Sequence, residues 1–279
     1  MRTLPTPEEC ATWTDEDYFA YDAVNASALK ELVKSPKLYQ HSLSVKKPPT
    51  INMVLGSAIH CLTFEASEFE LRYAIWEGGS RRTKAYKEWA SGVAAEGRAI
   101  LTESEHMNAL EVARAATRHP LLLELLGHPG TLVECVIVWD GLFGVCKAKL
   151  DLLHYSEEHG LIVADLKTTG SALDEHSLTH SMGRYLVHLQ LYHYWQAACA
   201  LFGLPVNETY DARLIALYAE TSAPHDTVAC ELGPETLEQV KSLYFDLAET
   251  FHECQRLNSW PGYQRERLVE VPAYYTQQK

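Results

Sequence analysis

Three consecutive strands joined by tight turns are the feature that most constrains the fold of this chain. The first, Leu132-Val-Glu-Cys-Val-Ile-Val-Trp139, is rich in β-branched residues and runs into Asp140-Gly141, a strong hairpin signal. A second expected strand over residues 143–155 ends in the polar turn Ser156-Glu-Glu-His-Gly160, and a third covers residues 161–167. Short turns between consecutive strands predict an antiparallel meander.

Helical patterns precede and follow this meander. The expected helices before it cover residues 28–33, 54–65, 84–100 and 103–118, and the elements after it are a helix over 183–202, a strand over 212–219 and a helix over 235–257. This order predicts an α/β or α+β fold in which helices flank a mixed sheet. We expect residues 1–130 to form a helical N-terminal region and residues 131–279 to form the core of the protein.

The composition of the 279 residues is typical of a globular protein, with 47% hydrophobic and 22% charged residues. The densest apolar run, residues 121–126, is interrupted by Glu124 and is much shorter than the roughly 18 residues of a membrane span, so no membrane association is expected. Residues 1–17 are polar and acidic, unlike a secretory signal. The seven cysteines are scattered without a CxxC pair, which favours reduced thiols in the cytoplasm over disulfides or a zinc knuckle.

The formal net charge is −13. This charge argues against a protein that coats DNA, because phosphates are neutralised by Lys and Arg at the contact surface. It says little against a metal-dependent nuclease, since such an enzyme concentrates carboxylates around its cations.

Two carboxylates and a lysine gather in the second and third expected strands. Side chains alternate along a strand, so Asp165 and Lys167 point to the same face, roughly 6–7 Å apart along the chain. With the turn centred near Glu158, Asp151 pairs with Asp165 across the ladder, close enough for both to share one cation. An Asp-x-Lys sequence is often a solvated strand edge, but the apolar run at residues 161–164 indicates a buried strand and favours a functional site.

This set of residues suits the hydrolysis of a phosphodiester. Carboxylate oxygens are the ligands that Mg²⁺ prefers, and the metal activates water and polarises the phosphate. The ammonium of Lys167 would orient the nucleophile or offset developing charge. The sequence therefore predicts Mg²⁺ as the cofactor, with Mn²⁺ able to replace it.

The order of these residues along the chain resembles a known family. His60, Glu134, Asp151, Asp165-Leu-Lys167 and Gln190-Leu-Tyr-His-Tyr194 occur as in the RecB-like branch of PD-(D/E)xK nucleases. Within that branch the chain looks most like the nuclease region of RecE (exonuclease VIII) and its phage-borne relatives. Other stretches that resemble this group are Ser27-Ala-Leu-Lys30, Ser35-Pro-Lys-Leu-Tyr39, Leu55-Gly-Ser-Ala-Ile-His60 and Arg82-Thr-Lys-Ala-Tyr-Lys-Glu-Trp89. The likeness covers about residues 20–200.

The resemblance implies a restriction-endonuclease-like core that degrades linear double-stranded DNA from an end, 5′→3′, and leaves 3′ single strands for recombination. It also implies a ring-like homo-oligomer, a trimer or tetramer, that works with a strand-annealing recombinase. The helical N-terminal region would contribute to the active site and the DNA channel. The chain lacks the long N-terminal extension of the largest relatives, so we expect a nuclease module alone. It also lacks the cysteine set that holds an iron–sulfur cluster in some RecB-like nucleases, so none is expected.

The residues and the resemblance together define the candidate site. The predicted catalytic residues are Asp151, Asp165, Lys167, Glu134, Gln190 and Tyr194. The predicted metal ligands are Asp151, Asp165, Leu166, His60 and Glu134. The predicted DNA-binding residues are the basic cluster Arg81, Arg82, Lys84 and Lys87, together with Lys149.

Each of these assignments has a structural alternative. Glu134 also fits an outward-facing position on an edge strand, and His60 also fits a packed helical histidine. Gln190 and Tyr194 share a helix face crowded with aromatic residues that build core, and the basic cluster also fits a solvated helix face. Asp174, His176 and His180 are three potential ligands, but their spacing suits a polar loop better than a zinc site.

Two other functions remain open beside the exonuclease. The same motif would serve an endonuclease or nickase, because it specifies phosphodiester chemistry and not dependence on an end. A catalytically silent DNA-binding or assembly subunit is a third possibility, although Asp151, Asp165 and Lys167 are all intact.

Overall fold

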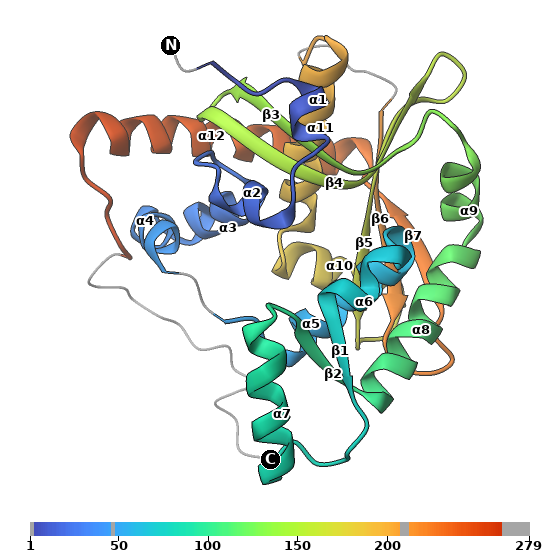
Figure 1. Ribbon diagram of the computed structural model, residues 1–279. Helices are drawn as coiled ribbons and strands as arrows, with labels where there is room; N and C mark the ends of the chain where they lie inside the picture. Colours follow the sequence, from blue (N-terminus) through green and yellow to red (C-terminus); the bar gives the residue numbers. More distant parts are fainter. Residues whose placement is uncertain (1–2, 46–47, 207–211, 264–279) are drawn as a thin grey trace, which may run out of the picture.

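The computed structural model describes residues 3–45, 48–206 and 212–263. The expected meander forms from β3 (Leu132–Gly141), β4 (Gly144–Ser156) and β5 (Gly160–Thr169), all antiparallel. β6 (Ala212–Glu220) pairs in parallel with β5, and β7 (Thr227–Glu231) pairs antiparallel with β6. The result is a five-stranded mixed sheet in the order β3-β4-β5-β6-β7 (Figure 1).

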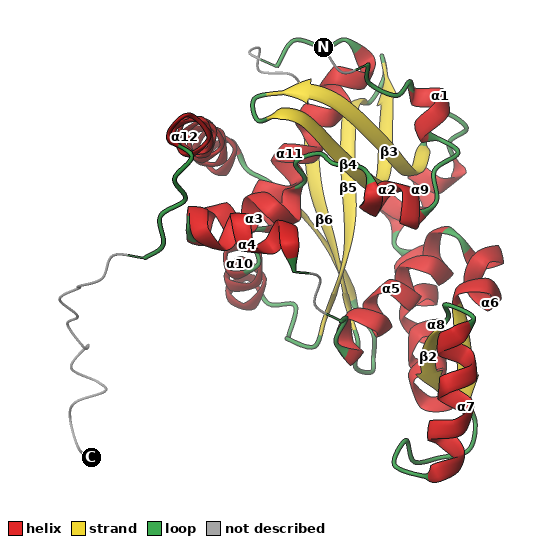
Figure 2. Ribbon diagram, turned by 60° about the vertical axis from the view of Figure 1, so that its left-hand side comes forward, coloured by secondary structure: helices red, strands yellow, loops and turns green. Residues whose placement is uncertain are grey.

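A helical crossover makes the parallel β5–β6 pair possible, because parallel neighbours cannot be joined by a tight turn. The crossover contains α10 (Glu175–Arg184) and α11 (Val187–Phe202). α11 packs on one face of the sheet together with α3 (Ala26–Lys34) and α12 (Pro234–Leu257) (Figure 2). Its buried residues Leu189, Leu191 and Ala197 belong to the larger hydrophobic core.

The opposite face of the sheet is covered by α5 (Ile51–Phe64), α8 (Glu103–Arg118) and α9 (Pro120–Gly127) (Figure 2). β5 is apolar on both sides because it lies between these two helical layers. Leu161 and Val163 point into the core under α11, whereas Ile162, Ala164 and Leu166 point into the core under α5 and α8. By the same alternation, Asp165 and Lys167 face α11.

The remaining elements are short and all lie before residue 130. They are α1 (Pro7–Cys10), α2 (Asp15–Ala20), α4 (Pro36–Ser44), η1 (Ala66–Glu68), α6 (Phe69–Arg72), α7 (Lys84–Ala95), and the strands β1 (Tyr73–Trp76) and β2 (Ala99–Thr102). Within the described ranges, no helix has the length and apolarity needed to cross a membrane.

The predicted fold class, a mixed sheet flanked by helices, is confirmed. Four details differ from the elements expected from the sequence. The region before residue 130 is not purely helical, because β1 and β2 form a parallel two-stranded sheet. The helix expected over 84–100 ends at Ala95, and Gly97, with φ +75°, turns the chain into β2. The helix expected over 183–202 begins only at Val187, because the chain breaks at Leu186, whose φ of +50° is left-handed, and Gly183 and Arg184 end the separate helix α10. β7 was not expected.

Candidate active site

The site lies where β4 and β5 separate. Their last backbone pair is Leu152 with Ala164, and one further step of the same register sets Asp151 opposite Asp165. Leu150 faces the core under α11 while Leu152 faces the core under α5, so the regular alternation of β4 breaks at Asp151. Beyond this point the backbone N–H of Leu166 donates to Asp151 Oδ2 at 2.7 Å, and a side chain therefore replaces the strand-to-strand hydrogen bond.

Glu134 reaches the same place from β3. The pairs Val133–Leu152 and Cys135–Leu150 set Glu134 opposite Asp151. Its backbone has a φ of +50°, in the left-handed region that side chains other than glycine rarely adopt. Such a conformation costs about 1–2 kcal/mol and persists where the surroundings impose it, which is common at functional sites.

His60, on the helix α5, completes a three-residue group with Glu134 and Asp151. Its Nδ1 is 3.4 Å from Asp151 Oδ2. One ligand atom from each of His60, Glu134 and Asp151 lies within 4.8 Å of the others. We call these three residues the ligand cluster. Two carboxylates and an imidazole form a donor set that suits a divalent cation, with waters completing the shell.

Asp165 and Lys167 lie beside the ligand cluster, in a second group. Asp165 is only 1% exposed, and its Oδ2 forms an ion pair with Lys167 Nζ. Gln190 Nε2, on α11, donates to Asp165 Oδ1 at 3.0 Å and to the Tyr194 hydroxyl at 2.8 Å. The side chains of Asp165, Lys167, Gln190 and Tyr194 are therefore joined, as their shared faces on strand and helix predict. Asp165 is outside the ligand cluster, and Leu166 contributes its N–H to Asp151.

The electrostatics of the carboxylates indicate a site built for positive charge. Burial and the nearby Asp151 raise the pKa of Glu134 to about 7, although Lys149 acts in the opposite direction. Burial also raises the pKa of Asp165, with Lys167 opposing and Asp151 adding to the rise. The pKa of Asp151 is nevertheless lowered, because His60, Lys167 and the Leu166 N–H outweigh its burial. A divalent cation would relieve the repulsion among these buried carboxylates.

Of the predicted DNA-binding residues, Lys149 lies at this site, whereas the basic cluster does not. Lys149 is held between Glu134 (2.8 Å) and Asp15 (2.7 Å), so it neutralises the ligand cluster. Arg81 is bound to Glu105, with Nη1 3.0 Å from Oε1. Arg82, Lys84 and Lys87 are exposed on and just before α7, which packs against β2 and projects away from the large sheet (Figure 2).

One residue of the site was missed as a functional candidate. Lys30, on α3, donates from Nζ to Gln190 Oε1 at 2.7 Å and so extends the chain of contacts that ends on Asp165. Burial lowers the pKa of Lys30 to about 8, and the charge of Lys167 adds to the effect. The only sequence signal for it was the likeness of Ser27-Ala-Leu-Lys30 to the nuclease family.

Known proteins resemble this chain in fold and in family. No curated protein matches the sequence. The crystal structure of a "Putative exonuclease" from Eubacterium rectale matches with a TM-score of 0.63 at 11% identity, over 94% of this chain and 96% of that chain, which shows a shared fold. A crystal structure of SSO0001 has 18% identity over 81% of this chain and 84% of that chain, with a TM-score of only 0.31. Residues 25–267 match the family described as "PDDEXK-like domain of unknown function (DUF3799)". The chain therefore belongs to this family of PDDEXK-like domains.

Proposed function

We propose that this protein is a nuclease that hydrolyses the phosphodiester backbone of DNA with the help of a divalent cation. The observation that carries the proposal is the position of the ligand cluster directly beside the Asp165–Lys167 pair, where β4 and β5 separate. Carboxylates that hold a cation, next to an ammonium that can reach a phosphate, are the groups that this reaction requires. Membership of a PDDEXK-like family supports the same chemistry.

His60, Glu134 and Asp151 would hold the cation, and Asp165 and Leu166 stay further ligands predicted from the sequence. The cation supplies Lewis-acid polarisation of the phosphate and favours ionisation of the attacking water. Lys167 Nζ donates to a phosphate oxygen or to the attacking water, and its ion pair with Asp165 sets its position. Gln190 fixes Asp165 in turn through the 3.0 Å hydrogen bond, so α11 acts as the support of the site.

The finer proposal is an exonuclease of the RecE-like type. It would degrade linear duplex DNA 5′→3′ with Mg²⁺ or Mn²⁺, act as a trimeric or tetrameric ring in the cytoplasm, and pass 3′ strands to a strand-annealing recombinase. Its support is the order of the motifs from His60 to Tyr194 and the fold shared with a protein described as a putative exonuclease. Light scattering tests the ring directly, since a stable monomer that degrades DNA processively would contradict it.

The deciding experiment compares linear duplex DNA with covalently closed duplex DNA, each incubated with the protein and Mg²⁺. An exonuclease consumes only the linear form, and this is the expected result. Cutting of both forms would replace the exonuclease by an endonuclease or nickase. If both forms stay intact while the protein binds them, the chain is a silent binding subunit. Asp165→Asn serves as the control for a contaminating nuclease, because its activity should be lost.

A further inference from the structure

A cleft with a volume of about 920 Å³ opens beside the Asp165–Lys167 pair. Its floor is the end of β5, one wall is the start of α5 around Asn52, and the other wall is α10. Lys30 and Gln190 also line it, so the contacts that position Asp165 reach its surface. We call this space the basic cleft, and its charged or titratable nitrogen side chains are Lys30, Lys167, His176, His180 and Arg184.

The charge of the basic cleft is opposite to that of the whole chain. The sequence contains 37 Asp and Glu against 24 Lys and Arg, yet none of the described residues that line this cleft is acidic. The hydroxyl groups of Thr168, Thr169 and Ser181 add uncharged polar groups to its walls. A surface that excludes carboxylates in so acidic a protein is complementary to an anion.

α10 presents a row of three side chains to the basic cleft. His176, His180 and Arg184 are four residues apart in turn, so they lie along one face of the helix, and all three are exposed. Across the part of the chain that the structure describes, no carboxylate forms an ion pair with any of the three. The Arg184 guanidinium lies 5.7 Å from the ring centre of Tyr185, which is 60% exposed at the same end of the helix.

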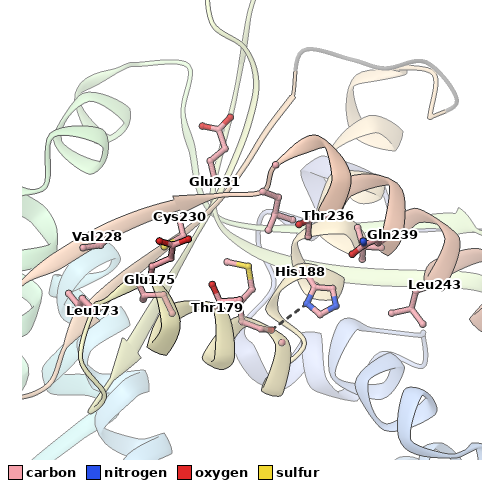
Figure 3. A pocket seen from close by; sticks show the side chains of 16 residues that line it. Leu173, Glu175, Thr179, His188, Val228, Cys230, Glu231, Thr236, Gln239 and Leu243 are labelled. Atoms are coloured by element: carbon pink, nitrogen blue, oxygen red, sulfur yellow. Dashed lines mark hydrogen bonds between the residues drawn. The ribbon is translucent and has the colours of Figure 1, made fainter.

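The other side of α10 has a different character (Figure 3). The pocket there, about 720 Å³ in volume, is lined by apolar residues such as Leu178 and Leu243 and carries the carboxylates of Glu175 and Glu231. His188 is the imidazole on this side, and its Nδ1 lies 3.3 Å from the carbonyl oxygen of Met182. The helix therefore separates an acidic, apolar pocket from the basic cleft, and only the second suits phosphate.

We propose that the basic cleft binds a short single-stranded stretch of the DNA next to the phosphate that is cut. Lys30 and Lys167 would contact the phosphates nearest the site, His176, His180 and Arg184 would contact the following ones, and Tyr185 would offer its ring for base stacking. The volume is that of a small-ligand site, which matches a few nucleotides of one strand. This inference rests on the proposed nuclease function.

The test measures binding of a fluorescent oligothymidylate to the full-length protein by anisotropy, in Ca²⁺ and in EDTA, at several salt concentrations. The variant is His176→Gln/His180→Gln/Arg184→Gln. One matched control is Arg114→Gln, which removes the same permanent charge from the exposed face of α8. A second control is Thr179→Ala, on the opposite side of α10. We expect the triple variant to bind at least roughly tenfold more weakly, and its salt dependence to fall by about 0.7 for each phosphate that it no longer neutralises. Both controls should bind as the wild type does.

Three results would overturn the inference: a triple variant that binds like Arg114→Gln, a wild-type protein that binds the probe in neither buffer, or an unlabelled duplex that competes as well as the single strand. Cleavage of linear duplex by the wild type is measured separately. If the wild type cleaves DNA but oligothymidylate binding does not depend on the basic cleft, only this inference is wrong. If binding depends on the basic cleft but the protein never cleaves DNA, the proposed nuclease function is wrong and the binding site remains.

Discussion

Asp151 accepts a hydrogen bond from the backbone N–H of Leu166, so one side chain both belongs to the ligand cluster and holds β4 to β5 after their ladder has ended. The metal site and the sheet therefore depend on the same side chain. A residue that keeps an acceptor at this position should keep the sheet joined even when it no longer holds a cation.

Asp151→Asn and Asp151→Ala should separate these two roles. Both variants lose a ligand charge, so both should bind Mn²⁺ poorly. Only the alanine leaves the buried Leu166 N–H without its partner, which costs about 1–3 kcal/mol. Urea unfolding in EDTA should show the alanine variant to be less stable than the asparagine variant by that amount. Equal stability would mean that this hydrogen bond does not join the strands.

The backbone at Glu134 predicts a conflict between stability and function. With a φ of +50°, this position favours glycine, so Glu134→Gly should be more stable than Glu134→Ala by about 1 kcal/mol. Both substitutions remove a ligand, and both should abolish the stabilisation that the wild type gains from Mn²⁺. Thermal unfolding with and without Mn²⁺ measures both effects. A glycine variant less stable than the alanine variant would contradict the strained conformation.

Acid should destabilise the protein through His193, on α11. Burial lowers the pKa of His193 from 6.5 to about 4, although the Lys147 carbonyl partly opposes this. Nε2 lies 3.2 Å from that carbonyl oxygen and donates to it, and Nδ1 accepts from the Tyr244 hydroxyl at 2.8 Å, so the neutral ring is satisfied. Between pH 6.5 and 4 the unfolded chain binds the proton and the folded chain does not, so stability falls as the pH falls through this window.

The loss from His193 amounts to about 3 kcal/mol at the acid end of the window. Urea unfolding at pH 7 and at pH 4 should therefore show a larger decrease for the wild type than for His193→Gln. The comparison of the two decreases cancels the contribution of the other titrating groups. A variant that loses as much stability as the wild type would show that His193 is not held neutral.

Cleavage should require Mg²⁺ or Mn²⁺, while Ca²⁺ should support DNA binding better than cleavage. The reason is the donor set of the ligand cluster, which is dominated by carboxylate oxygen. Cleavage assays with each ion and with EDTA measure this, and binding assays in Ca²⁺ provide the comparison. Full activity in excess EDTA would exclude the metal from the reaction.

The parts of the fold that could be predicted are those with a strong local signal. β3 and β5 were expected because buried strands require runs of β-branched and apolar residues. α8 was expected over its observed range, residues 103–118, and its start is marked by the Thr102–Glu105 capping box. β1 and β2 are too short to show a period, and β7 is a short edge strand of mixed polarity. The break at Leu186 involves a left-handed residue that is not glycine.

The residues of the candidate site also divide into those with a local sequence signal and those without one. The register that sets Asp151 opposite Asp165 follows from the turn position, because a hairpin of known centre specifies its register, although the ladder itself ends at Leu152 and Ala164. Glu134 could be placed on its strand but not at its strained φ, which only the packed structure imposes. Lys30 contacts Gln190 from 160 residues away, and no local pattern reports such a contact. His176 and His180 were assigned to a loop, whereas Asp174 caps a helix that aligns both with Arg184.

The most direct test of the proposed nuclease function is the comparison of the Lys167→Ala variant with the Asp165→Asn variant. An ammonium is not a ligand, and losing it frees Asp165 from its ion pair, so Lys167→Ala should keep its affinity for metal. Asp165→Asn removes a buried charge, so metal binding and cleavage should both be lost. Calorimetric titration with Mn²⁺ and single-turnover cleavage of linear duplex DNA measure the two properties. We predict that Lys167→Ala binds metal like the wild type and cleaves about 10²–10³ times more slowly. Cleavage by Lys167→Ala at the wild-type rate would contradict the assignment of this site to phosphodiester hydrolysis.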